Sequence, residues 1–300
     1  MTHIVSHVAT LISAPTAPAV DRALIEAAAA RLGATTTDVL ANGIAADVHF
    51  SAEPGTERAL ADDLRAHLAA PVDVVVQKAD GRAKGLLIAD MDSTMIGQEC
   101  IDELAAELGL KEKISAITER AMRGEIAFEP ALRERVGLLA GLPANVVEKV
   151  IAERIRLTPG AVELVRTMKA NGAYTALVSG GFTVFTGPIS RTIGFHEHRS
   201  NTLIEADGKL AGTVAEPILG QDAKRASLLE LAEAKKVPMA LTLAVGDGAN
   251  DLAMIRESGL GVAFHAKPKV AAEAHARIDH GDLTALLYLQ GYRRSEFVAS

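Results

Sequence analysis

Two aspartates separated by a single residue follow a short apolar run. The run covers residues 86–89, and Asp90 and Asp92 come directly after it, followed by Ser93 and Thr94. Two carboxylates this close repel each other unless they share a cation or a proton. A hard divalent ion such as Mg²⁺ binds carboxylate oxygens and a substrate phosphate together. The segment therefore predicts a metal-assisted phosphate site centred on Asp90, with a polar surface turn as the alternative.

Polar residues also follow two later apolar runs, at residues 173–178 and 240–245. Because ligands bind at the carboxyl ends of strands in open parallel α/β sheets, these residues are expected near Asp90. A Ser-Gly-Gly turn offers backbone N–H groups to an anion, although most such turns are ordinary loops. A lysine in the first turn of the predicted helix 221–236 is usually a solvated face residue, although its charge opposes the helix dipole, which adds a little weight to a functional role. The candidates are Ser179, Gly180, Lys224, Asp247, Asn250 and Asp251.

The apolar runs before these residues are expected to be strands buried on both faces. They cover residues 86–89, 173–178, 240–245 and 259–264, and helical patterns lie between them. Such an order is typical of a parallel sheet that has helices on both faces. The second half of the chain is therefore predicted to be an α/β domain that brings the candidate residues to one edge of its sheet.

Residues 99–155 interrupt this alternation with a stretch that is almost entirely helical in period. Gly109, Gly124 and residues 141–143 divide it into about four pieces. Short helices without an intervening strand are expected to pack on each other as a small bundle. Inserted between two strands of the sheet, the bundle would cover the strand ends, exclude water and supply specificity.

Residues 1–80 have a different pattern, which predicts a separate small α+β domain. The expected order is strand, helix, strand, helix and strand, over residues 3–13, 20–32, 37–50, 56–69 and 71–77. Within the third of these segments, Asn42-Gly43 is a turn signal. The domain carries no recognisable nucleophile, metal-ligand spacing or glycine-rich loop, and residues 79–84 are expected to be a polar linker.

The composition is that of a globular protein with a substantial core. Of the 300 residues, 49% are hydrophobic and 23% are charged. The formal net charge of -7 and the lack of a Lys/Arg cluster argue against a nucleic-acid surface. There is no apolar run of about 18 residues that would predict a membrane span, and no secretory signal pattern. The single cysteine, Cys100, is expected to be a small buried side chain, and these features together predict a cytoplasmic protein.

Four separated segments agree in order and position with a known superfamily. D-M-D-S-T at 90–94, S-G-G at 179–181, Lys224 and G-D-G-A-N-D at 246–251 together resemble the haloacid dehalogenase (HAD) superfamily of phosphohydrolases. The resemblance implies a HAD-like doubly wound parallel-sheet core with a small helical-bundle cap inserted after the first motif, preceded by an ACT-like α+β domain. The implied domains are 1–80 (ACT-like), 81–98 with 157–300 (core) and 99–156 (cap).

Within the superfamily, the segments in and before the cap resemble the phosphoserine phosphatase family. They are residues 91–94 with Glu99, 121–124, Phe128 and 132–136. The resemblance implies that Asp90 is a nucleophile that becomes an aspartyl-phosphate, and that Asp92 is the general acid and later the base. It also implies Mg²⁺ held by Asp90, the backbone carbonyl of Asp92, and Asp247, where the ion neutralises charge between nucleophile and phosphate.

The remaining core candidates are implied to surround the phosphate. Ser179 and the Gly180 N–H donate to it, and Lys224 binds both a phosphate oxygen and the nucleophile's carboxylate. Asn250 is implied to be a ligand on the substrate side. Asp251 is implied to support the site by anchoring Lys224 or metal-bound water.

The cap candidates are implied to select the substrate by charge. Phosphoserine carries a carboxylate and an ammonium besides its phosphate, so a selective cap needs a cation and an anion. Arg135 can bind a carboxylate with two hydrogen bonds, and Glu99 can pair with the ammonium. A solvated helix-face arginine is the alternative for Arg135. Met122 and Phe128 are implied to line the closed cap.

The implied reaction is hydrolysis of O-phospho-L-serine to L-serine and phosphate, the last step of serine biosynthesis. A HAD phosphatase or phosphotransferase for another small phosphomonoester is the nearest alternative, since only Glu99 and Arg135 argue against it. A phospho-accepting receiver domain would be shorter and would need no cap, and a regulatory amino-acid binder would not need the complete acidic set. The N-terminal domain could bind serine, pair two subunits into a homodimer, or have no regulatory part.

Overall fold

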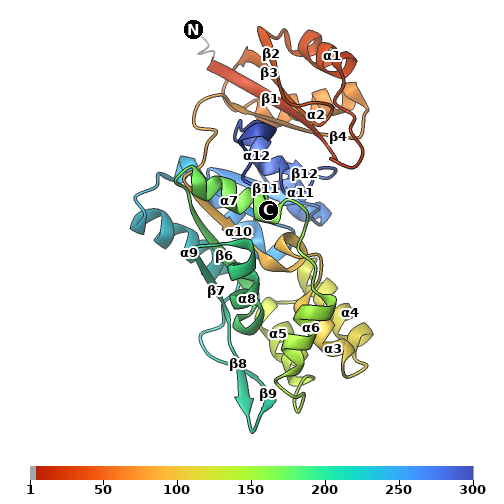
Figure 1. The fold of residues 1–300 in the computed structure, drawn as a ribbon, viewed down its shortest axis with the longest axis vertical. Coiled ribbons are helices and arrows are strands. Elements are labelled where there is room, and N and C mark those ends of the chain that lie inside the picture. The colour runs from red at the N-terminus through yellow and green to blue at the C-terminus, as the bar shows by residue number, and fades with distance from the viewer. Residues whose placement is uncertain (1–4, 300) are drawn as a thin grey trace.

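The computed structural model describes residues 5–299, apart from the side chain of Met122. An antiparallel sheet with two helices lies at one end of the long axis, a parallel sheet in the middle and a group of helices at the other end (Figure 1). Among the helices of residues 5–299, none combines the length and the apolar character needed to cross a membrane.

The central sheet has the strand order β12-β11-β10-β5-β6-β7, with all neighbouring strands parallel. Its strands are β5 (Leu86–Ala89), β6 (Tyr174–Phe182), β7 (Glu197–Asn201), β10 (Thr242–Gly246), β11 (Leu260–Phe264) and β12 (Ala276–Ile278). The strand β5 lies between β6, which follows it in the chain, and β10, on the opposite side. Its carboxyl end is therefore the point where the order of the sheet reverses, the usual place for a ligand in this kind of fold.

Alternate residues of β5 pack into different layers. Leu86 and Ile88 lie in the hydrophobic cluster of α9 and α10, whereas Leu87 and Ala89 lie in that of α7, α8 and α12. The helices of this part are α7 (Ala161–Ala170), α8 (Thr183–Ile193), α9 (Gln221–Ala234), α10 (Leu252–Glu257), α11 (Pro268–Glu273) and α12 (Ala285–Leu289). The run at 86–89 has no polar alternation because both of its faces are covered.

The four apolar runs expected to be strands match β5, β6, β10 and β11, and the structure adds β7 and β12 at the two edges. The sequence of β7 is E-H-R-S-N, and four of its five residues are only partly buried. β12 has three residues. An edge strand that is polar or this short leaves no apolar run for sequence analysis to detect.

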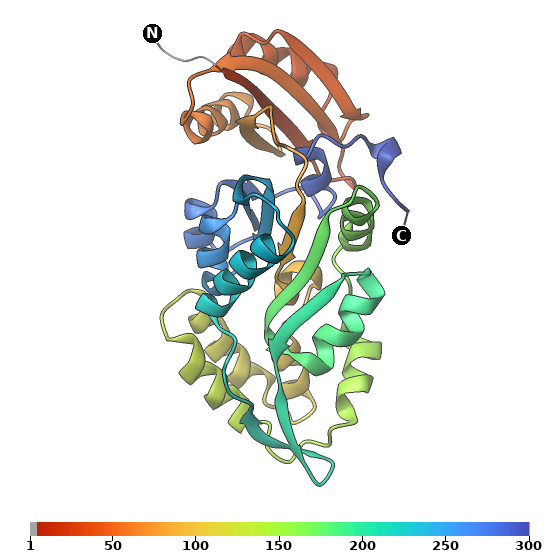
Figure 2. The ribbon, with the colours of Figure 1, turned by 90° about the vertical axis from the view of Figure 1, so that its left-hand side faces the viewer.

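The helical insert forms the cap, with four helices as expected. They are α3 (Cys100–Ala106), α4 (Lys111–Met122), α5 (Phe128–Gly137) and α6 (Val146–Arg154). The hairpin of β8 (Leu203–Ala206) and β9 (Lys209–Val214), which turns at Asp207-Gly208, reaches the cap at the far end of the molecule (Figure 2). Backbone hydrogen bonds between Leu210 and residues 141 and 142 connect the hairpin to the loop between α5 and α6.

The N-terminal part has one strand more than expected. Its elements are β1 (Val5–Ser13), α1 (Arg22–Leu32), β2 (Thr36–Ala41), β3 (Ala45–Ala52), α2 (Glu57–Leu68) and β4 (Val72–Lys78). The apolar segment 37–50 folds back at Asn42-Gly43 into two paired strands, so the antiparallel sheet has the order β2-β3-β1-β4. The helices α1 and α2 share a hydrophobic cluster with this sheet, and its other face packs on the side of the core where α12 lies.

The segment expected to be a polar linker contributes to the contact between the two sheets. Arg82 donates to both oxygens of the buried Asp47, at 2.6 and 3.1 Å, and to the carbonyls of Tyr288 and Leu289 at the end of α12. On β4 of the same sheet, the buried Asp73 accepts hydrogen bonds from the backbone N–H groups of residues 279–281. A buried carboxylate is tolerated because such partners satisfy it, so the polar segment that links β4 to β5 also helps to hold the two parts together.

Candidate active site

Asp90 lies at the carboxyl end of β5 and is almost fully buried. Its Oδ1 accepts a hydrogen bond from the Met91 N–H at 2.8 Å and lies 2.7 Å from Lys224 Nζ. Within the described residues, Oδ2 accepts no hydrogen bond. Just beyond, Ser93 has a left-handed backbone with φ of 54°, which costs about 1–3 kcal/mol for a non-glycine residue and is typical of functional turns. One oxygen of Asp90 is thus fixed and the other is left for a ligand.

Lys224 connects two of the carboxylates. Its side chain is fully buried in the first turn of α9, and Nζ lies 2.7 Å from Oδ1 of both Asp90 and Asp251. Burial alone would lower the pKa of Lys224, but the charges of Asp251 and Asp90 raise it above the usual value. The lysine that opposes the helix dipole in the sequence is therefore a buried cation between two anions.

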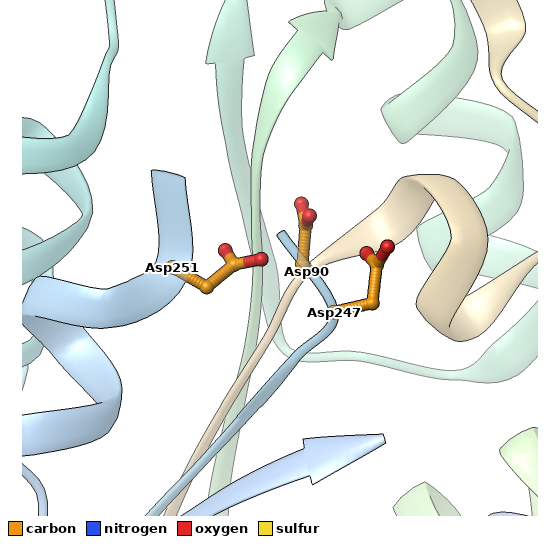
Figure 3. A group of neighbouring side chains, drawn as sticks. All are labelled: Asp90, Asp247 and Asp251. Atoms are coloured by element: carbon orange, nitrogen blue, oxygen red, sulfur yellow. The ribbon is translucent and has the colours of Figure 1, made fainter. Parts of the chain in front are cut away.

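Three carboxylates converge at this edge of the sheet, from Asp90, Asp247 and Asp251 (Figure 3). One oxygen from each lies within 4.8 Å of the others. Burial, and then the charge of Asp251, raise the pKa of Asp90 to about 7, and the same causes raise the pKa of Asp247 well above its usual value. A single lysine does not compensate three anions, so the group fits a bound cation, which would relieve the remaining repulsion.

The carboxylates differ in how many oxygens are available for a cation. Asp251 uses Oδ1 for Lys224 and Oδ2 for the Gly248 N–H at 3.1 Å. Asp247 has one long contact, at 3.4 Å from the Thr94 hydroxyl. Asp90 and Asp247 are therefore the side chains best able to hold a metal, while Asp251 holds Lys224.

A cavity of about 550 Å³ lies between this sheet edge and the cap. The predicted residues that line it are Asp90, Asp92, Glu99, Phe128, Arg135, Ser179, Gly180 and Asn250. Lys224, Asp247 and Asp251 are not part of its lining and are buried beside Asp90. The side chain of Met122 lies outside the described residues. Eight of the candidates, from four separate stretches of the chain, thus line one cavity.

Glu99 is a carboxylate without a cationic partner. Its Oε1 accepts from the Ser93 hydroxyl at 2.7 Å, and no lysine, arginine or histidine nitrogen of the described residues lies within 4.0 Å of it. Burial, with the charges of Asp92 and Asp247, raises the pKa of Glu99 well above its usual value. An anion in such a place is costly unless a ligand supplies the opposite charge.

Arg135 lines the same cavity and is a cation without an anionic partner among the described residues. The residue is only 6% exposed, yet no carboxylate of the described residues lies within 4.0 Å of its guanidinium. Its Nε donates to the Ala131 carbonyl at 3.1 Å and its Nη1 to the Thr118 hydroxyl at 3.0 Å. Burial lowers the pKa of Arg135. The alternative of a solvated helix-face arginine is excluded by this burial.

Asp92 and the Ser-Gly-Gly turn lie next to each other in the lining of the cavity, since a Cβ atom on Gly181 would be 2.8 Å from Asp92 Oδ2. Asp92 Oδ1 accepts from the Cys100 N–H at 3.0 Å, and burial raises the pKa of Asp92. Ser179 accepts from the Gly181 N–H at 2.9 Å. A Cβ atom on Gly180 would lie 2.7 Å from Cζ of Phe128 in the cap. Glycine is thus needed where the cap's aromatic ring closes over the strand end.

Sequence analysis missed several residues of this cavity. Thr118, Gln221 and Lys269 line it, and Asp102 lies behind Thr118 and accepts its hydrogen bond at 2.9 Å. Lys269 and Gln221 sit at the starts of α11 and α9, where a polar residue is common. Thr118 and Asp102 follow the helical period of the cap like any other residue, so no signal distinguishes them in the sequence.

Comparisons with known proteins agree with this arrangement. The model of the haloacid dehalogenase-like hydrolase family matches residues 87–256. A phosphoserine phosphatase of Streptomyces coelicolor is 44% identical over 235 residues, which are 78% of this chain. The match spans 57% of that relative's own length.

A solved structure extends the likeness to most of the N-terminal part as well. A HAD-family hydrolase of Salmonella enterica serovar Typhi has a TM-score of 0.82 and 30% identity, covering 95% of this chain and 98% of its own. A phosphoserine phosphatase solved as a phospho-aspartyl intermediate analogue has a TM-score of 0.66 and 41% identity, covering 69% of this chain and 98% of its own. The chain therefore belongs to the haloacid dehalogenase-like hydrolase family.

Proposed function

We propose that this protein is a Mg²⁺-dependent phosphoserine phosphatase that hydrolyses O-phospho-L-serine to L-serine and phosphate. The observation that carries the proposal is that the cavity above Asp90 is lined by a carboxylate, Glu99, and a buried guanidinium, Arg135, neither of which has an oppositely charged partner within 4.0 Å among the described residues. A buried charge is normally paired, so the two indicate a ligand that brings both opposite charges. The name of the Streptomyces coelicolor relative supports the same substrate.

Phosphoserine matches the three charged parts of the cavity. Its carboxylate would bind Arg135, its ammonium Glu99, and its phosphate the edge where Ser179, Gly180 and Asn250 lie. Lys224 would add a cation beside the phosphate and the nucleophile. A phosphate ester without the amino-acid part would leave the half-buried Glu99 and the buried Arg135 unpaired, which is how such a site rejects it.

In the proposed reaction, Asp90 Oδ2 attacks phosphorus in line and forms an aspartyl-phosphate. The phospho-aspartyl analogue described for a 41% identical structure supports an intermediate of this kind. Lys224, on the other oxygen of Asp90, holds the carboxylate in place and favours its ionised form. The attacking oxygen is therefore the one that accepts no hydrogen bond from the described residues.

Asp92 is proposed to be the general acid for the departing serine oxygen and then the general base for the attacking water. Its raised pKa, caused by burial, allows it to keep a proton until the serine oxygen leaves. The resulting carboxylate then takes a proton from the water that hydrolyses the aspartyl-phosphate. The Cys100 N–H fixes Oδ1, so Oδ2 is the oxygen for this transfer.

Mg²⁺ would be held by Asp90, Asp247 and the backbone carbonyl of Asp92, and when bound it would neutralise charge between the nucleophile and the phosphate. Asp251 would keep Lys224 in position, and Met122 and Phe128 would close the cap over the substrate. The reaction would be the last step of serine biosynthesis in the cytoplasm. A homodimer formed through the N-terminal domain, and domain limits at 1–80, 81–98 with 157–300, and 99–156, belong to the same proposal.

The substrate assignment predicts that Arg135→Ala acts selectively. We expect kcat/KM for phosphoserine to fall about 100-fold, since a charge pair in a desolvated site contributes about 2–5 kcal/mol. Phosphoethanolamine has the phosphate and the ammonium but no carboxylate, so its kcat/KM should change less than about 3-fold. Phosphate release from both esters measures the difference.

Glu99→Gln is the matching variant that tests recognition of the substrate's ammonium group. It should weaken hydrolysis of phosphoserine but not of 3-phosphoglycerate, in which a hydroxyl replaces the ammonium. Equal losses on all three esters for both variants would mean that neither side chain recognises the amino-acid part.

A further inference from the structure

Among the described residues, the guanidinium of Arg135 is connected to a carboxylate through a hydroxyl group and makes no direct ion pair. Its Nη1 donates to Thr118 Oγ1 at 3.0 Å, and Thr118 Oγ1 lies 2.9 Å from Asp102 Oδ1. Thr118 is 2% exposed and lines the cavity, while Asp102 is 8% exposed and comes from the neighbouring helix α3. The three residues form a chain of cation, hydroxyl and carboxylate that joins three helices of the cap.

The direction of the hydrogen bonds in this chain follows from the donors. Arginine has only donors, so the Thr118 oxygen accepts from it and has one proton left to give. Asp102 Oδ1 at 2.9 Å is a closer acceptor than the Ile114 carbonyl at 3.1 Å, and it is charged. The other oxygen of Asp102 accepts from the Ser115 hydroxyl at 2.6 Å. The carboxylate is therefore satisfied by two hydroxyl groups and not by the arginine itself.

The inserted hydroxyl has a consequence for Arg135. A direct pair with Asp102 would occupy both nitrogens of the planar fork that recognises a carboxylate. Through Thr118, only Nη1 is used and Nε is held by the Ala131 carbonyl. The buried positive charge is thus balanced through Thr118, while Nη2 donates no hydrogen bond to the described residues and Arg135 lines the cavity.

We propose that Thr118 and Asp102 are positioning residues that orient Arg135 and so give the enzyme its preference for substrates with a carboxylate. The inference rests on the proposed function. It adds two residues that would not touch the substrate's carboxylate themselves but decide whether Arg135 can bind it.

The test is Thr118→Val, which keeps the size of the side chain and removes the hydroxyl. Without it, the guanidinium loses its fixed orientation or moves to pair with Asp102. We expect KM for O-phospho-L-serine to rise about 10-fold or more, as for loss of a hydrogen bond to a charged group, with kcat changed much less. Phosphoethanolamine kinetics should stay within about 3-fold, which also shows that the variant is folded.

Two further variants separate positioning from packing. Thr118→Ser keeps the hydroxyl and loses only a methyl group, so it should restore the KM for phosphoserine. Ser115→Ala removes the other hydroxyl from the same carboxylate without touching Arg135, so its KM should stay close to that of the wild type. A Thr118→Ser protein as weak as Thr118→Val would show that packing, and not the hydroxyl, is what matters.

The outcomes also separate this inference from the proposed function. If the wild type prefers phosphoserine over phosphoethanolamine and Thr118→Val keeps that preference, the positioning role is overturned and the function stands. Equal losses on both esters would likewise assign Thr118 a purely structural role. If the wild type shows no such preference, the proposed substrate is wrong and the inference is overturned with it.

Discussion

Asp90→Asn is expected to abolish phosphate release, with kcat reduced about 10⁴-fold or more, as for removal of a catalytic nucleophile. The neutral amide cannot form the acyl phosphate, although it fills the same space at the end of β5. The fold should persist, because Lys224 keeps its contact with Asp251 at 2.7 Å and one of three crowded carboxylates is removed. Steady-state phosphate release and a thermal unfolding curve measure the two effects.

A control for Asp90→Asn is Asp80→Asn, an exposed aspartate in the segment before β5. It should leave both turnover and unfolding unchanged. Brief reaction of the wild type with ³²P-labelled substrate, followed by acid, should leave label on the protein, and Asp90→Asn should leave none. Turnover retained by Asp90→Asn would contradict its role as the nucleophile.

Lys224→Met is expected to cost both activity and stability. The lysine is the cation that lies between the buried Asp90 and Asp251, and its removal leaves these carboxylates without compensation. Breaking a buried pair in this way typically costs about 3–5 kcal/mol. Turnover should fall about 10³-fold, since the nucleophile loses its orientation and the phosphate its cation. Denaturant unfolding without substrate measures the change in the free energy of unfolding.

A second substitution separates the two effects of Lys224→Met. Adding Asp251→Asn removes the charge that the lysine compensated, so stability should recover in part while turnover stays lost. Lys113→Met, at an exposed position of the cap, is the control for the loss of a lysine and should change neither. A Lys224→Met protein as stable as the wild type would mean that the two carboxylates do not depend on this ion pair.

The site at the sheet edge could be predicted because Asp90 and Asp247 follow the carboxyl ends of strands, and the hydrophobic pattern shows where those strands end. The apolar runs of β5 and β10 stop at Asp90 and just before Asp247, and parallel strands bring such ends together. Lys224 stood out because its charge opposes the helix dipole. For the strand ends a local rule of the sequence indicates the position, whereas the role of Lys224 was implied by the family resemblance.

The contacts that could not be predicted join residues that no motif or hydrophobic pattern distinguishes in the sequence. Arg82 lies in a polar loop, and its partner Asp47 lies 35 residues before it, on strand β3 of the N-terminal sheet. Thr118 meets Arg135 and Asp102 only because three helices of the cap pack together. Periodicity gives the face of a helix but not the residue that will stand opposite it. The same limit hid the edge strands β7 and β12, which have little apolar pattern.

The most direct test of the account is phosphate release by the wild-type protein from four esters, with and without Mg²⁺. The esters are O-phospho-L-serine, phosphoethanolamine, 3-phosphoglycerate and an aryl phosphate. We expect Mg²⁺-dependent release with kcat/KM for phosphoserine at least about 100-fold above the other three, because only this ester pairs with both Glu99 and Arg135. Mg²⁺-dependent release without that preference, or no release from phosphoserine at all, would contradict the proposed function.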